Sequence, residues 1–365
     1  MLDDKFLTNI KDAPEVVENL IIGAGVVLVY VTTSTLVKRL IICRDYDTKH
    51  IKRIRKQPEL IQNQNKVNLD RIRNEEYRNL LKIFSRKMIE NLPESNLINF
   101  YNNINKLKIR KSIQPTLIRA AGVYEPVTNE VQLGISAGIL IDTNVLFHEL
   151  IHMASSIYKN GVTYTGFSQR THLGYSSIGM GLTEGYTQLL TERIFGIKPL
   201  YEPYLKEMEI SQNVEKIIGK DKMQELFFNA DLKGLVKELG KYSSEQETLA
   251  FIKKVDFINQ YETRARTHSN YQTKLVEEAN KDVYKYLLKI YKTKQEKYLK
   301  EGIINQKEFI NKVAKFIYDI KLDTYQYNAV LVDKKDRKEV IDAVLTDERL
   351  HSKVHQKLFL MSNEK

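Results

Sequence analysis

Two histidines and a glutamate stand close together in the stretch His148-Glu149-Leu150-Ile151-His152. If this stretch is helical, the histidines are four positions apart on one face, so their ring nitrogens can converge on one ion. Two neutral imidazoles are two of the three protein ligands that an open, catalytic zinc site needs. Glu149 would project beside the metal, where its carboxylate can take a proton from bound water. The pattern therefore predicts a metal site that activates water.

The residues around this pattern predict a helix that is buried on nearly all sides. Residues 145–154 are mostly apolar, which is typical of a helix in a domain interior. Burying two imidazoles and a carboxylate there is costly unless something satisfies them, and a metal ion would do so. We expect the helix to cover about 144–159, with Asp142 or Thr143 as its cap and Asn160-Gly161 as a left-handed stop.

A second stretch, residues 181–193, has the apolar spacing of another helix, which the glycine of Phe195-Gly196 would stop. We expect Glu184 in the first turn of this helix. If the Glu184 carboxylate meets both imidazoles, it completes a site of two histidines and one glutamate, with the fourth position left for water. The side chains expected to face the core are Leu182, Tyr186, Leu189, Leu190 and Ile194.

Together the two stretches resemble the gluzincin type of zinc metallopeptidase, in which H-E-x-x-H on one helix is followed by a ligand glutamate on the next. The run Leu182-Thr183-Glu184-Gly185-Tyr186-Thr187 looks like the Asn-Glu-Gly-aromatic signature around that glutamate, with threonine where asparagine is usual. The resemblance covers some fifty residues. It implies a zincin-like catalytic domain that binds Zn²⁺ through His148, His152 and Glu184, with Glu149 as general base.

The chain also departs from related patterns. It has no Gly-x-Met-Glu-Asn motif, so an aminopeptidase has no support, and Tyr158 stands where a metzincin would have its third histidine, with Ser155 in place of the glycine. Four residues after the ligand glutamate, where some gluzincins carry an acidic group, this chain has Gln188. The hydrogen-bond partner of the ligand histidines is therefore open between Gln188 and Glu192.

The segment between the two helices, residues 162–180, is expected to be a loop or short strand near the metal. A hydrogen-bond donor is needed there to stabilise the oxyanion of a tetrahedral intermediate. His172 and Tyr175 are candidates because they are near in sequence. A purely structural role for either is the simpler interpretation, and His172 could also replace Glu184 as the third ligand.

Composition sets further bounds. Of 365 residues, 42% are hydrophobic and 28% charged, which is ordinary for a folded protein. Cys43 is the single cysteine, so no intramolecular disulfide is possible. The net charge of +11 would permit nucleic acid or anionic membrane as a partner. The lysines are spread along helical stretches and no nucleic-acid module is visible, so no specific nucleic-acid partner is expected.

Residues 19–37 are an uncharged run that is just long enough to cross a bilayer as one helix. A buried core helix or hairpin is the alternative. Acidic residues precede the run and basic residues follow it from Lys38 onward, so a single-pass protein would keep its catalytic domain in the cytoplasm. A cleaved signal peptide is disfavoured because the residues before the run are acidic.

The fold class expected from these patterns is α+β and mostly helical. Helices are expected over 68–92 and 94–107, separated at Pro93, and a hairpin of strands over 116–125 and 130–135. The family resemblance suggests that a strand of this small antiparallel sheet pairs with an extended peptide substrate. The expected divisions are a short N-terminal segment (1–18), the span (19–37), a basic linker (38–66), the catalytic core (67–198) and a helical C-terminal lobe (199–365).

The function expected from the sequence is a membrane-tethered zinc peptidase that cleaves peptide or protein substrates, as an endopeptidase because no terminal-amine motif is visible. A non-catalytic, membrane-anchored interaction protein with a structural or vestigial zinc site is the alternative. A fourth zinc ligand from the protein would favour that alternative. A third hypothesis is a soluble cytosolic peptidase in which residues 19–37 belong to the core.

Overall fold

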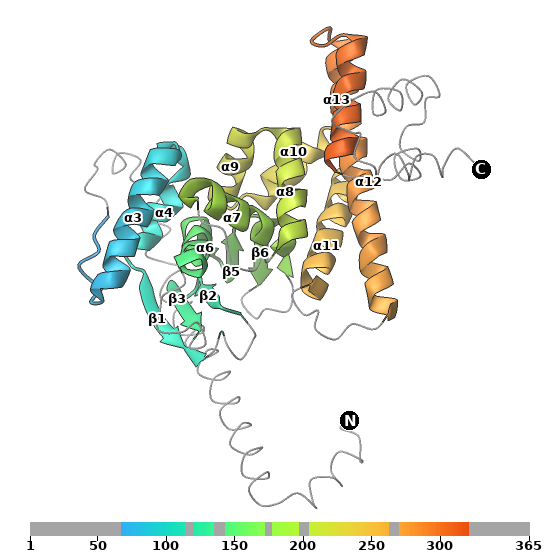
Figure 1. Cartoon of the computed structure of the whole chain (residues 1–365). Helices are drawn as coiled ribbons and strands as arrows, with labels where there is room; N and C mark the ends of the chain where they lie inside the picture. The colour runs from blue at the N-terminus through green and yellow to red at the C-terminus, as the bar shows by residue number, and fades with distance from the viewer. Residues whose placement is uncertain are drawn as a thin grey trace, which may run out of the picture.

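The computed structural model describes residues 67–113, 115, 120–134, 143–171, 177–196, 204–262 and 270–320. This part of the chain is α+β and mostly helical, with two small sheets. The elements follow one another across the molecule in nearly the order of the sequence (Figure 1). Helix α3 (Glu75–Asn91) lies at one side, and α12 (Asn270–Lys300) and α13 (Gln306–Asp319) lie at the other. One hydrophobic core joins them, with members from Leu69 to Ile320.

The first helical layer consists of α3 (Glu75–Asn91), the 3-10 turn η2 (Glu94–Asn96) and α4 (Ile98–Ile104). Helix α3 begins later than the predicted residue 68 because the Asn74 side chain caps it, accepting a hydrogen bond from the Tyr77 N–H. Pro93 separates the two helical segments as predicted. The second helix was predicted over 94–107, but only Ile98–Ile104 is α-helical.

The first sheet contains β1 (Lys108–Ser112), β2 (Gly122–Glu125) and β3 (Glu130–Gly134) in the order β1-β3-β2. Strands β2 and β3 form the predicted antiparallel hairpin, with Tyr124 opposite Val131. The prediction of an antiparallel sheet was incomplete, since β1 pairs with β3 in parallel. Among the described strands of this sheet, β2 lies at one edge.

Helix α6 (Thr143–Ala154) carries the histidines and is buried on nearly every side, as predicted. Its predicted end at residue 159 is wrong. The Asn103 side chain donates hydrogen bonds to the carbonyl oxygens of Met153 (2.8 Å) and Ser156 (2.9 Å), and the Ser156 hydroxyl donates to the His152 carbonyl oxygen (2.7 Å). These bonds satisfy carbonyl groups that the next helical turn would otherwise have used.

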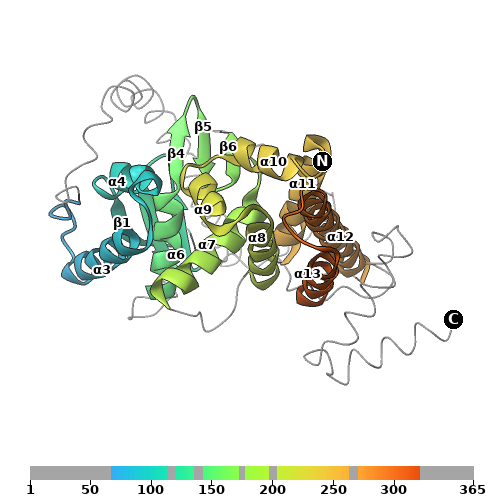
Figure 2. The same ribbon diagram turned by 90° about the horizontal axis from the view of Figure 1, so that it is seen from above.

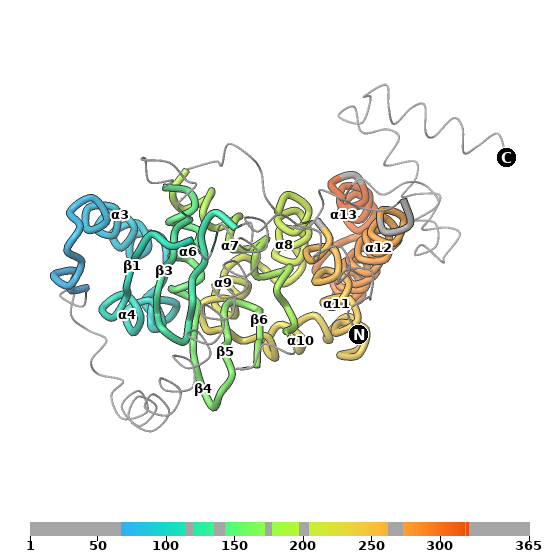
Figure 3. Tube along the Cα trace, turned by 90° about the horizontal axis from the view of Figure 1, so that it is seen from below, coloured from blue at the N-terminus to red at the C-terminus, as the bar shows by residue number. Residues whose placement is uncertain are grey.

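Immediately after α6 the chain forms a second sheet. The sequence predicted a loop or short strand over 162–180, but not a sheet of four strands. It is an antiparallel meander of β4 (Ser156–Lys159), β5 (Val162–Thr165), β6 (Ser168–Thr171) and β7 (Ser177–Ile178) (Figure 3). Asn160 and Gly161 do adopt left-handed backbone angles, with φ of 51° and 72°. They form the two-residue turn of the β4–β5 hairpin instead of a helix stop.

Helix α7 (Met180–Phe195) matches the predicted second helix and ends at Gly196, which is left-handed. Glu184 is the fifth residue of this helix, so it lies one residue beyond the predicted first turn. Of the predicted core positions, Leu182, Tyr186, Leu190 and Ile194 are buried and Leu189 is partly buried. A packing helix, α8, approaches so closely that a Cβ on Gly185 would lie 2.1 Å from the Glu207 carbonyl oxygen.

The rest of the described chain is helical, as predicted for the C-terminal part. Its helices are α8 (Leu205–Ile218), α9 (Lys220–Phe228), α10 (Leu232–Gly240), α11 (Glu245–Glu262), α12 (Asn270–Lys300) and α13 (Gln306–Asp319). Figure 2 shows α11, α12 and α13 on the side of α8 away from α7. Within the described residues, no helix is both long and apolar enough to cross a bilayer. The predicted span at 19–37 and linker at 38–66 lie outside those residues.

Candidate metal site

Helices α6 and α7 bring together the three side chains that the sequence predicted as ligands. His148 Nε2 and His152 Nε2 lie 3.1 Å apart, and Glu184 Oε2 lies 3.1 Å from the first nitrogen and 3.3 Å from the second. The histidines are buried and Glu184 is nearly so. This group can bind a metal ion.

The spacing of the three atoms fits tetrahedral coordination. With bonds of about 2.0–2.1 Å, the ligand atoms around a tetrahedral zinc ion lie roughly 3.3 Å apart. The observed distances of 3.1–3.3 Å are close to this value. Three electron-pair donors would repel one another at such distances without a cation or protons between them. The donor set of two imidazoles and one carboxylate therefore fits a divalent metal.

Each imidazole has a second partner on α7. His148 Nδ1 lies 3.1 Å from Gln188 Oε1, and the Gln188 amide in turn donates to Glu192 Oε1 over 3.0 Å. The sequence left the partner of the ligand histidines open between Gln188 and Glu192. Both residues belong to one chain of hydrogen bonds, in which Gln188 contacts His148 directly. His152 Nδ1 lies 3.4 Å from the Thr187 hydroxyl. Such contacts fix the ring so that Nε2 faces the metal position.

Glu149 lies beside the ligand group and is held by the first sheet. The Tyr124 N–H donates a hydrogen bond to Glu149 Oε2 over 2.6 Å. Strand β2 can come this close because residue 122 is a glycine. A Cβ added at this position would lie 2.7 Å from Val145 Cγ1 and 3.1 Å from Glu149 Cγ. Burial raises the pKa of Glu149 to about 7, although nearby His148 lowers it. A carboxyl group with that pKa can exchange protons near neutral pH.

Glu184 has the opposite electrostatic environment. Burial by itself would raise its pKa, but the charge of His152 and hydrogen bonds from both imidazoles outweigh burial and hold the pKa well below its usual range. Two neighbouring carboxyl groups therefore have pKa values pushed far apart. Such a separation suits an ionised ligand next to a proton-transferring group.

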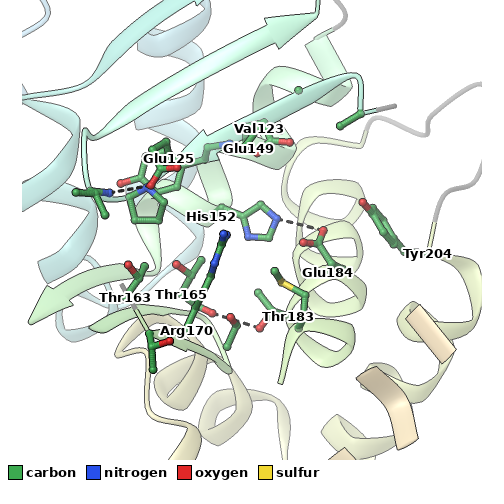
Figure 4. A pocket seen from close by; sticks show the side chains of 18 residues that line it. Val123, Glu125, Glu149, His152, Thr163, Thr165, Arg170, Thr183, Glu184 and Tyr204 are labelled. Carbon is green, nitrogen blue, oxygen red and sulfur yellow. Dashed lines mark hydrogen bonds and ion pairs between the residues drawn. The ribbon is translucent and has the colours of Figure 1, made fainter. Parts of the chain in front are cut away.

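A cavity of about 300 Å³ opens onto the ligand group (Figure 4). One wall is β2 with the turn after it, and the other wall is the second sheet, so both sheets shape the same cavity. Glu149, His152 and Glu184 lie at its surface. The remaining lining residues are Ala120, Gly122, Val123, Tyr124, Glu125, Pro126, Val127, Thr163, Thr165, Ser168, Arg170, Thr171, Met180, Thr183 and Tyr204.

Tyr204, which the sequence did not single out, belongs to the site. Its ring stacks on His148 at a centroid distance of 5.6 Å, and Figure 4 shows it beside Glu184. The charge of Glu184 raises the pKa of the Tyr204 hydroxyl well above its usual range, and burial and Glu149 add to this effect. The hydroxyl is therefore a neutral hydrogen-bond donor. The Tyr204 backbone is left-handed, with φ of 64°, immediately before α8.

Thr183 stands where the gluzincins that the sequence resembles usually have asparagine, and it ties α7 to the second sheet. Its hydroxyl accepts a hydrogen bond from the Phe167 N–H (3.0 Å) and lies 2.8 Å from the Gly179 carbonyl oxygen and 3.2 Å from that of Thr165. The residue next to the ligand Glu184 thus has a structural role here. The two other predicted site residues, His172 and Tyr175, lie outside the described residues.

Comparisons with protein families, with curated proteins and with solved structures find no match to this chain. The chemistry of the site therefore has to be inferred from its own residues and their geometry.

Proposed function

We propose that the chain is a zinc-dependent peptidase that cleaves within peptide or protein substrates. The observation that carries the proposal is the triangle of His148, His152 and Glu184 atoms, 3.1–3.3 Å on each side, next to the buried Glu149 and open to a cavity. The sequence resemblance to gluzincins assigns the same residues the same roles. Zinc is preferred because it binds imidazole nitrogen and carboxylate oxygen in tetrahedral sites.

His148, His152 and Glu184 would hold the ion, which supplies Lewis acidity and makes water more acidic when it is bound. Glu149 would take the proton of the attacking water on its carboxylate and pass it to the leaving amine. Burial raises its pKa to about 7 before the ion binds. The charge of a bound ion would lower this pKa again, which favours the carboxylate form that accepts the proton.

Tyr204 would act as the donor to the oxyanion of the tetrahedral intermediate. It lines the cavity next to the ligand Glu184, and its raised pKa keeps the proton on the hydroxyl. The sequence-based candidates for this role, His172 and Tyr175, stay predictions because they lie outside the described residues.

Strand β2 would align the substrate. In the β2–β3 hairpin, Gly122 and Tyr124 direct their backbone groups toward the edge, because the Tyr124 N–H points at Glu149 rather than at β3. The Tyr124 N–H is already bonded to Glu149, so an extended peptide would pair with the other backbone groups of this edge and lie alongside the candidate base. Endopeptidase action remains preferred because no group that binds a terminal amine is recognised in the sequence. The membrane tether and cytoplasmic orientation also remain predictions from the sequence.

Cleavage mapping tests the proposal. Zinc-loaded wild-type protein and Glu149→Gln are each incubated with a complex mixture of peptides, and new termini are identified by mass spectrometry. We expect cleavage at internal bonds by the wild type only, with equal zinc in both proteins. Zinc-loaded wild type that produces no new termini would contradict the peptidase, and would favour the non-catalytic interaction protein.

A further inference from the structure

Arg170 is a positive group in the cavity that the proposed reaction does not use. It lies on β6 opposite Thr163 of β5, and Figure 4 shows its side chain extending from the second sheet into the cavity. Its side chain is exposed. Among the ion pairs of the described residues, none includes Arg170.

The side chains around Arg170 on its own wall carry hydroxyl groups and no negative charge. Side chains two apart on a strand, and those directly opposite on the next strand, share one face of the sheet. Thr163, Thr165, Ser168 and Arg170 are related in this way, and all four line the cavity. The carboxylate of Glu125 lines the cavity from the opposite wall, on β2. The second sheet therefore offers one guanidinium among hydroxyl groups.

We infer that Arg170 and the neighbouring hydroxyl groups bind a carboxylate of the peptide substrate and so give the site a preference for acidic substrates. A guanidinium matches a carboxylate with two parallel hydrogen bonds. The carboxylate could be an acidic side chain or the C-terminus of the peptide, and the chemistry of recognition is the same for both. The inference rests on the proposed function for its role in cleavage, but peptide binding can be measured separately.

The test measures binding without cleavage. Full-length Glu149→Gln protein, loaded with zinc, is titrated into fluorescent peptide pools with amidated C-termini, in which one position at a time is fixed as Glu or as Gln. A second set compares the same peptides with free and amidated C-termini. We expect a carboxylate at one position, in a side chain or at the terminus, to bind on the order of tenfold more tightly than its amide. The preference should weaken with added salt.

Three variants assign the preference to its residue. Arg170→Gln should remove it, Arg170→Glu should turn it toward peptides with Lys at the same position, and Lys159→Gln should leave it unchanged. Lys159 is a suitable control because it is an exposed cation of the same sheet that does not line the cavity. Zinc content and the circular dichroism spectrum show whether each variant is folded.

The outcomes separate this inference from the proposed function. Equal binding of acid and amide peptides, no binding of either, or a preference that survives Arg170→Gln would overturn the inference. If the wild type still cleaves peptides after any of these outcomes, the proposed peptidase function stands and the carboxylate preference does not. A carboxylate preference that depends on Arg170, in a chain that cleaves nothing, would support the inference and reject the peptidase.

Discussion

The Tyr124 N–H donates a hydrogen bond of 2.6 Å to Glu149 Oε2, which joins the edge strand of the first sheet to the candidate general base. Glu149 lines the same cavity as His152 and Glu184. The bond also fixes the distance between the base and any peptide that pairs with β2. Substrate alignment and proton transfer would therefore depend on the same backbone position.

Glu149 should make the metal-free protein less stable as the pH rises. The pKa of Glu149 is about 7 in the folded chain, whereas its ordinary value, which applies to the unfolded chain, is 4.5. Between these two pH values the folded state therefore holds a proton that the unfolded state has lost. The stability that comes from this proton is present below about pH 4.5 and is lost as the pH rises through 7, by up to about 3 kcal/mol.

Urea unfolding in EDTA at pH 5 and pH 8 checks this effect. The difference in unfolding free energy between wild type and Glu149→Gln should shift against the wild type at the higher pH. Glu184 interferes little, because its lowered pKa keeps it ionised in the folded state and its ordinary value of 4.5 leaves it mostly ionised in the unfolded state across this range. A difference that is the same at both pH values would contradict the raised pKa.

Gln188→Leu should weaken metal binding. Removing the amide leaves His148 Nδ1 without its 3.1 Å contact, so the ring is less firmly oriented, and such losses typically cost 10- to 100-fold in metal affinity. Competition with a chromophoric chelator measures the affinity. Gln169→Leu, on β6 and outside the cavity lining, should have no such effect. Unchanged affinity in Gln188→Leu would show that the contact does not position the ligand.

Tyr204→Phe should lower kcat by about 10²-fold while zinc content stays the same, because the variant loses the hydroxyl but keeps the ring stacked on His148. Steady-state kinetics on any peptide cleaved by the wild type provides the measurement. Tyr291→Phe, whose ring stacks on Phe316 far along the chain, is the matched control. An unchanged kcat in Tyr204→Phe would transfer the oxyanion role to another residue.

Asp256→Asn should destabilise the protein. The Asp256 carboxylate on α11 accepts hydrogen bonds from the backbone N–H groups of Gly179 (2.7 Å) and Gly181 (2.9 Å), and so caps the helix that carries Glu184. An amide can accept with one oxygen only, so unfolding free energy should fall by about 1–2 kcal/mol.

Chemical denaturation of Asp256→Asn and of Asp282→Asn provides the comparison. Asp282 is half exposed and pairs with Lys254 on the surface, so its replacement should change stability by less than about 0.5 kcal/mol. Equal effects of the two substitutions would show that the cap contributes nothing beyond a surface ion pair.

The ligand group could be predicted from the sequence because its signals are local. His148 and His152 are one helical turn apart, and Glu184 lies in a periodic stretch that ends at a glycine. The second sheet could not be predicted in the same way. Asn160-Gly161 favours left-handed backbone in a hairpin turn as well as after a helix. The contacts of Asn103 and the Ser156 hydroxyl with the end of α6 are what the sequence pattern does not reveal.

Other parts of the site depend on contacts between distant residues. Tyr204 stacks on His148 across 56 positions of sequence, and no motif marks it apart from its place after Pro203. Asp256 caps a helix whose N-cap residue, Gly179, lies 77 positions before it. Arg170 is one of many basic residues, and only the sheet register places it in the cavity. These relationships arise from packing, which periodicity alone does not reveal.

The most direct test of the central claim is the zinc content of the purified chain, measured by mass spectrometry after dialysis against buffered zinc. The proposed site predicts one zinc ion per chain in the wild type and in Glu149→Gln, and loss of that ion in His148→Ala and Glu184→Ala. A folded wild-type chain that retains no zinc would contradict the proposed site. Alanine variants that retain as much zinc as the wild type would also contradict it.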